Sequence, residues 1–130
     1  MFSGKEKARL AAVSRSQAVI EFDREGNVLS ANEIFLKLMG YTEAEIIGRH
    51  HSLFVMPEER DSPDYAAFWQ SLRAGQFQAR VFLRVAKDGR EVWIQASYNP
   101  ILDGHGLTKS VKNIANDITA QKAAMAELNS

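Results

Sequence analysis

Residues 77–100 read FQARVFLRVAKDGREVWIQASYNP, and this stretch decides the fold class. Apolar side chains recur at every second position on both sides of the turn at 87–89, and a period of two is that of a β-strand. An Asp-Gly pair between two alternating runs is typical of a hairpin turn. The stretch therefore predicts two antiparallel strands, whose alternating positions put two sets of residues on shared faces: Phe77, Ala79, Val81, Leu83 and Val85 before the turn, and Val92, Ile94, Ala96 and Tyr98 after it.

Three further strands are predicted on either side of this hairpin. Residues 17–23 and 28–30 are rich in β-formers and flank a turn in which Gly26 is free to adopt a positive φ. A last strand is predicted at 108–117. Consecutive hairpins imply an antiparallel sheet, so we expect five antiparallel strands in all.

Three short helices are predicted between the second and third strands. The first, at 32–39, begins with Asn32 as its N-cap; the second, at 42–47, is opened by a capping box; the third, at 62–74, begins with a Ser-Pro pair. Such helices must cover one face of the sheet, and the fold class is therefore α+β. A sheet covered by short helices and loops encloses a concavity in which a small ligand can bind.

Composition excludes several classes of function. The chain of 130 residues has no cysteine, which excludes disulfides, thiolate metal sites and thioether-linked haem. Sixteen Lys and Arg balance sixteen Asp and Glu, so there is no basic surplus for nucleic acid. No apolar run approaches the ~20 residues of a membrane span, and residues 1–13 lack the apolar core of a signal peptide. We expect a cytoplasmic protein with no direct membrane insertion and, for want of a catalytic motif, no enzymatic activity.

Four short motifs along residues 14–120 carry a family resemblance. They are GNV with AN at 26–32, MGY with E and IG at 39–48, KDG with WI at 87–94, and DIT at 117–119. In this order they resemble the PAS sensor family. The resemblance implies the PAS fold, with an N-terminal cap or entering helix at 1–16, a PAS domain at 17–118 and the start of a signalling helix at 119–130.

A narrower resemblance concerns the type of PAS protein. The segments HHSLF at 50–54, YAAFW at 65–69, GQF at 75–77 and WIQASYNPI at 93–101 are similar to N-terminal PAS domains of bacterial methyl-accepting chemotaxis receptors, including aerotaxis-type receptors. This resemblance implies a sensory input module whose signal is oxygen, redox state or a small ligand. It also implies a non-covalent cofactor, FAD or b-type haem, and a downstream receptor signalling domain reached through the C-terminal helix.

Two histidines and a tryptophan are the first candidates for cofactor binding. Neutral imidazole ligates haem iron, and His51 is the candidate metal ligand if haem is the cofactor, with His50 beside it. The alternative is a surface His50 and a hydrogen-bonded His51. Flavin-binding PAS domains resemble this chain in having a Trp where Trp69 stands, although Val55 and Met56 replace the Arg-His pair of the aerotaxis group. The alternative for Trp69 is a place in the core of its helix.

Two asparagines and the chain ends complete the predictions. Asn32 either points its amide into the pocket or caps the N-terminus of its helix. Asn99 either points its amide into the pocket or forms hydrogen bonds at the end of its strand. The residues Ile118, Gln121, Met125 and Leu128 follow helical 3–4 spacing, and a homodimer through the flanking helices is predicted from this seam. The alternative function is a ligand-free PAS dimerisation or protein-interaction module whose cavity is closed by side chains: Phe54, Met56 and Phe68.

Overall fold

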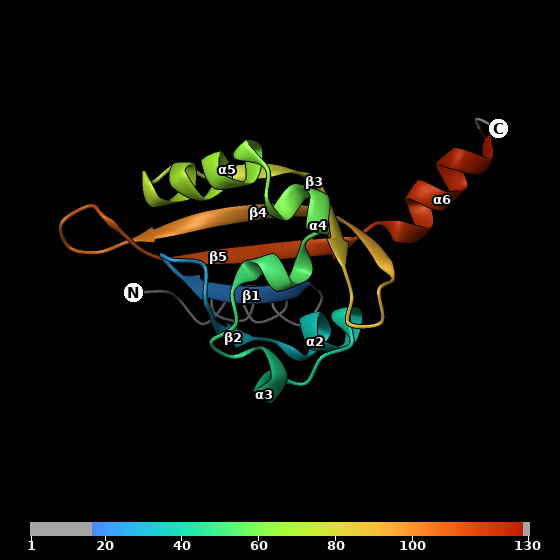
Figure 1. Ribbon diagram of the computed structural model, residues 1–130, viewed down its shortest axis with the longest axis horizontal. Coiled ribbons are helices and arrows are strands. Elements are labelled where there is room, and N and C mark those ends of the chain that lie inside the picture. The colour runs from blue at the N-terminus through green and yellow to red at the C-terminus, as the bar shows by residue number, and fades with distance from the viewer. Residues whose placement is uncertain (1–16, 129–130) are drawn as a thin grey trace, which may run out of the picture.

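A single five-stranded antiparallel sheet forms the centre of the molecule, as the computed structural model shows for residues 17–128 (Figure 1). The strand order is β2-β1-β5-β4-β3. The predicted helix within 1–16 lies outside the described residues. Five strands and their antiparallel pairing confirm the predicted sheet, and their bounds are β1 Ala18–Asp23, β2 Val28–Ala31, β3 Gln78–Val85, β4 Glu91–Leu102 and β5 Thr108–Asp117.

The connection from β2 to β3 contains the helical segments that cover the inward face of the sheet. Their apolar side chains share one core with the inward face of the strands. The final helix projects away from this body (Figure 1). The predicted α+β class is therefore confirmed, with these helical elements: α2 Glu33–Met39, α3 Glu43–Ile46, the 3-10 helix η1 His51–Phe54, α4 Pro57–Arg60, α5 Pro63–Arg73 and α6 Thr119–Leu128.

The helix ends follow the capping signals in the sequence. The side chain of Asn32 accepts a hydrogen bond from the backbone N–H of Phe35, and α2 ends at Gly40 with φ +79°. Ser62 caps α5 in the same way, with Pro63 in the first turn. Two helical segments were not predicted, η1 and α4, because four residues are too few to show a helical period and neither begins with a capping box as α3 does.

The buried face of β3 is not the face with the most apolar residues. The face that points into the core carries Phe82 and Arg84, which are 6% and 3% exposed. The alternating apolar residues of the sequence are on the other face, where Val81 is 44% exposed. An arginine therefore enters the interior from the edge strand of the sheet, and its surroundings define the candidate site. Among residues 17–128, no helix is long and apolar enough to cross a bilayer.

Candidate functional site

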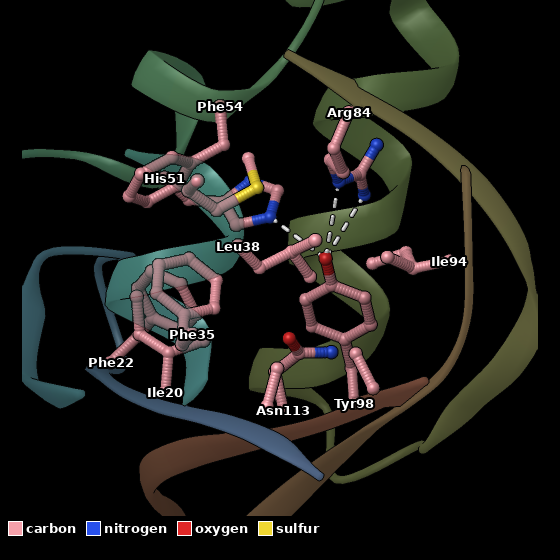
Figure 2. Close-up of a pocket in the computed structure, with 13 residues that line it drawn as sticks. Ile20, Phe22, Phe35, Leu38, His51, Phe54, Arg84, Ile94, Tyr98 and Asn113 are labelled. Carbon is pink, nitrogen blue, oxygen red and sulfur yellow. Dashed lines mark hydrogen bonds between the residues drawn. The ribbon is translucent and has the colours of Figure 1, made fainter. Parts of the chain in front are cut away.

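A small cavity lies between the inward face of the sheet and the segments α2 and η1 (Figure 2). Its volume is about 10 Å³, the space of roughly one water-sized sphere. Most of its wall is apolar, and the polar groups come from three strands and from η1. The lining residues are Ala18, Ile20, Phe22, Phe35, Leu38, Met39, His51, Phe54, Arg84, Ile94, Tyr98, Asn113 and Ala115.

A chain of hydrogen bonds runs from the wall of this cavity into the core. His51, only 1% exposed, uses both ring nitrogens. Its Nδ1 lies 2.8 Å from the hydroxyl of Tyr65, and its Nε2 lies 3.0 Å from the hydroxyl of Tyr98. Trp69 donates its indole N–H to Tyr65 over 3.2 Å, and Arg84 donates to Tyr98. We call these five residues the His51 cluster.

The guanidinium group of Arg84 determines the direction of this chain. Its Nε and Nη2 both donate to the hydroxyl oxygen of Tyr98, over 3.3 and 3.1 Å (Figure 2). Because that oxygen accepts twice, its own hydrogen is free to point at Nε2 of His51, which then accepts. The network thus assigns the Nδ1–H tautomer to His51, with Nδ1 donating to Tyr65.

Burial and charge keep the imidazole of His51 neutral. Desolvation lowers the pKa of His51 well below its usual value, and the positive charge of Arg84 and the neighbouring imidazole of His50 act in the same direction. Burial also raises the pKa of Tyr65 to about 12, so its hydroxyl stays protonated. The cluster therefore contains a single formal charge, the guanidinium of Arg84, whose Nη1 forms an ion pair with Glu59 over 3.2 Å.

Local sequence explains how His51 reaches the interior. His50 adopts an extended conformation, and its Nδ1 accepts from the backbone N–H of Ser52 over 3.1 Å, so it is the N-cap of η1. The next residue, His51, also donates its backbone N–H to the carbonyl of Gly26 over 2.8 Å. These two bonds fix η1 against the β1–β2 turn and direct the imidazole of His51 into the core.

The predicted site residues occupy different places. His51 lines the cavity, whereas His50 caps η1 outside it. Trp69 is 4% exposed and packs edge-on against Phe22, with ring centroids 5.8 Å apart. Asn32 is the N-cap of α2, its Nδ2 donating to the carbonyl of Gln17. The structure brings His51 and Trp69 together, and their predicted role in cofactor binding stays a prediction.

Asn99 lies on the opposite face of β4 from the cavity. Its amide donates to the hydroxyl of Ser97 over 2.9 Å and to the carbonyl of Lys112 over 3.2 Å. The neighbouring Tyr98 faces the core instead, since successive side chains of a strand point to opposite faces. Asn99 thus bonds within the sheet, three residues before β4 ends, and its predicted role in cofactor binding stays a prediction. Asn113 of β5 is the asparagine that lines the cavity.

Sequence reasoning missed Tyr65, Arg84 and Tyr98 as site residues, and the irregular alternation of residues 108–117 does not decide whether Asn113 faces the cavity or the solvent. Only Arg84 carries a signal that could have found it. It stands two residues from Phe82 in an alternating strand, so a strand that buries Phe82 also directs an arginine inward. The others are ordinary core aromatics or polar residues until the fold brings α5, β4 and β5 together around His51.

Neither cofactor that the resemblance implies fits the residues as they are arranged. A flavin or porphyrin ring needs a pocket of roughly 300 Å³ or more, far above the volume of this cavity. Both nitrogens of His51 are engaged with hydroxyl groups, so neither faces an open position for iron. In the part of the chain that the structure describes, no three His, Cys, Asp or Glu residues are grouped to hold a metal ion.

A five-stranded antiparallel sheet that encloses a cavity against short helices is the architecture of a sensory domain. A family model described as the PAS fold matches residues 14–123, and the chain belongs to the PAS family. Solved structures agree on the fold. A light-oxygen-voltage domain studied with a flavin analogue is 24% identical with a TM-score of 0.72, covering 99% of this chain and 95% of that one. A PAS domain from Colwellia psychrerythraea is 20% identical with a TM-score of 0.75, covering 89% and 98%.

Curated relatives place the same domain in larger proteins. The biofilm dispersion protein BdlA of Pseudomonas aeruginosa is 44% identical over 113 residues, which cover 87% of this chain and 27% of BdlA. The bacterioopsin transcriptional activator of Halobacterium salinarum is 26% identical over 106 residues, which cover 82% of this chain and 16% of that protein. The chain therefore spans about a quarter or less of the length of these relatives.

Proposed function

We propose that this chain is the cytoplasmic sensory input module of a bacterial chemoreceptor. A small molecule or a non-covalent cofactor that enters the cavity changes the hydrogen bonds of the His51 cluster, and this change shifts α6 between two arrangements. Oxygen, redox state and a small metabolite are the signals that such a module detects. The 44% identity with the biofilm dispersion protein BdlA supports a role in bacterial signalling.

The observation that carries this proposal is the position of β4 between the cavity and α6. Tyr98, at the centre of the His51 cluster, lies on β4. On the same strand, the backbone N–H of Trp93 donates to the hydroxyl of Thr119 over 3.0 Å, and its carbonyl accepts from the N–H of Ile118 over 2.8 Å. A shift of β4 therefore acts directly on the segment at which α6 begins, as a change in populations of two states.

Two alternatives exist for the cavity: it binds a cofactor, or it binds no ligand. Flavin and b-type haem require the cavity to enlarge, and the light-oxygen-voltage domain studied with a flavin analogue makes flavin the first to test. The alternative, a ligand-free dimerisation or interaction module, requires the cavity to stay closed. Phe54, one of the side chains predicted to close it, lines the cavity, whereas Phe68 and Met56 do not.

An absorption spectrum of the protein purified from cells supplied with haem precursor and riboflavin distinguishes these cases. Flavin bands or a Soret band would identify the cofactor. A colourless protein would exclude both cofactors and leave a colourless small ligand or the interaction module. Native mass spectrometry of the same sample then separates these two, because a bound small molecule adds mass to the folded protein.

Tyr98→Phe tests the relay from the cavity to α6. It removes the hydroxyl that accepts from Arg84 and contacts His51, and leaving these groups unsatisfied costs about 1–3 kcal/mol of unfolding free energy. If β4 transmits the change, hydrogen exchange at Trp93 and in α6 rises above that of Tyr41→Phe. The hydroxyl of Tyr41 makes no hydrogen bond within residues 17–128, so this variant is the matched control. Faster exchange around the cavity alone, with α6 unchanged, would contradict the relay.

A further inference from the structure

A second concavity lies outside the core, between the helices α4 and α5 and the edge strand β3. It is an open groove of about 180 Å³. It meets the cavity described above at one shared residue, Arg84, and its remaining lining residues are different. Four of the side chains that line this groove are charged, two positively and two negatively: Arg80, Arg84, Glu59 and Asp64.

Among the four, only Arg84 and Glu59 neutralise each other within the described part of the chain. Arg84 and Glu59 form the ion pair already described. Among the described residues 17–128, Arg80 forms no ion pair with a carboxylate, and Asp64 forms none with a basic group. Both side chains line the same groove. The groove therefore presents one unmatched cation and one unmatched anion to a ligand.

The guanidinium group of Arg80 is held in place by aromatic rings. Its central carbon lies 5.0 Å from the ring centroid of Phe82 and 5.9 Å from that of Phe68. The guanidinium carbon of Arg84 lies 4.7 Å from the same Phe82 ring, so the two arginines share one aromatic platform. A side chain that is already oriented loses less conformational entropy when it binds a ligand.

We propose that this groove binds a free α-amino acid. The carboxylate of the ligand pairs with Arg80, and its ammonium group pairs with Asp64. The rings of Tyr65 and Phe68 supply the apolar part of the wall for the ligand side chain. A groove of about 180 Å³, below the range of roughly 300–1,000 Å³ for drug-sized ligands, suits a ligand of this size.

The balance of charges favours a zwitterion over a simple anion or cation. A ligand with only a carboxylate would pair with Arg80 but would meet the uncompensated carboxylate of Asp64. A ligand with only an ammonium group would meet Arg80 in the same way. One molecule with both charges satisfies both residues and leaves the Arg84–Glu59 pair intact. Arg80 and Asp64 do not line the cavity, so the proposal does not depend on the function proposed above.

The first experiment is a thermal-shift and calorimetric titration of the purified chain with each of the twenty free amino acids. We expect one or a few of them to raise the melting temperature and to bind with a stoichiometry of one. For the amino acid that binds best, the matched acid without its amino group and the matched amine without its carboxyl group are then titrated. Each analogue is expected to bind at least tenfold more weakly.

Variants identify the groove as the site. Arg80→Gln and Asp64→Asn should each weaken binding at least tenfold, and both residues are exposed, so the fold tolerates the changes. Arg24→Gln and Asp61→Asn remove the same charges at exposed positions outside the groove and should leave affinity unchanged.

Three results would overturn the proposal. They are the absence of binding by any amino acid at millimolar concentration, binding that survives Arg80→Gln, and binding of the amine-free acid that equals that of the amino acid. The last result would identify a simple anion site. None of the three depends on the absorption spectrum of the protein, so failure of this proposal and of the sensory role are distinguishable.

Discussion

At the scale of single residues, the neutral buried imidazole of His51 makes stability depend on pH. Burial lowers the pKa of His51 in the folded state, whereas in the unfolded chain it has its ordinary value of about 6.5. Below that value the unfolded state binds a proton that the folded state does not, so stability falls as pH falls. Between about pH 7 and pH 5.5 we expect a loss of about 1 kcal/mol of unfolding free energy, measured by urea titration.

Variants and spectroscopy separate His51 from the other titrating groups. His105→Gln, in the exposed β4–β5 turn, should keep the same pH dependence, and His51→Gln should lose most of it. If His51→Gln does not fold, an NMR titration of the imidazole nitrogens in the unchanged protein gives the same information. An imidazole of His51 that becomes protonated near pH 6.5 in the folded state would contradict the assignment.

The individual site residues differ in how far sequence could predict them. Asn32 and the N-cap of α2 follow from local spacing, because the cap bonds a residue three positions along the chain. The partners of His51 are 14 and 47 residues away in sequence. No local period encodes such contacts, so the histidine could be named as a candidate while its tyrosine partners could not.

At the scale of elements, the turn between β1 and β2 depends on close packing against η1 and α5. A methyl group on Gly26, where φ is +91°, would lie 2.8 Å from Nε2 of His50 and 3.1 Å from the Trp69 ring. Gly48 has a similar φ of +80° with open space around it. Gly26→Ala should therefore destabilise the protein by more than Gly48→Ala, whose cost is the roughly 1–2 kcal/mol of left-handed backbone alone.

Chemical denaturation of the two variants measures this difference directly. Because both substitutions impose the same backbone strain, the excess for Gly26→Ala reports the contacts with His50 and Trp69. Equal losses in the two variants would mean that η1 moves away at little cost. The β1–β2 turn and η1 would then not be packed as tightly as the distances indicate.

At the junction between β5 and α6, one hydroxyl group takes part in two hydrogen bonds. Thr119 accepts from the N–H of Trp93 over 3.0 Å, and its hydroxyl donates to the carboxylate of Asp117. Thr119→Val removes both bonds, while Thr119→Ser keeps them. We expect Thr119→Val to speed hydrogen exchange throughout α6 and to cost about 1 kcal/mol of global stability, with Thr119→Ser close to the unchanged protein. Unchanged exchange in α6 would show that the junction is held by other contacts.

Sequence periodicity predicted the long elements and missed the short ones. The alternation from 77 to 98 gave β3 and β4, yet β4 continues through Pro100 to Leu102. Pro100 is tolerated because β3 pairs with β4 only as far as Tyr98, so the strand has a free edge there. The inward face of β3 was not evident, since its outer face carries more apolar residues than the face that is buried.

At the scale of the whole molecule, two apolar surfaces have no partner among residues 17–128. The outer face of the sheet exposes Val81, and α6 exposes Met125 and Leu128, which are 57% and 81% exposed. Lys122 covers the ring of Trp93 at 4.3 Å, so one side of α6 is directed toward β4. Met125, which lies beside Lys122 and Trp93, and Leu128 belong to the residues with 3–4 spacing that are predicted to form a dimer seam.

The predicted homodimer follows from the exposed apolar residues of α6. A helix of ten residues is too short to be stable on its own, and pairing of the seam in a second copy would bury its apolar residues. Met125→Glu places a charge in the seam and should weaken dimerisation at least tenfold in analytical ultracentrifugation. Ala120→Glu adds the same charge at an exposed position outside the seam and should leave the dimer unchanged. A chain that stays monomeric at millimolar concentration, or a dimer that Met125→Glu does not weaken, would show that α6 does not form the contact between copies.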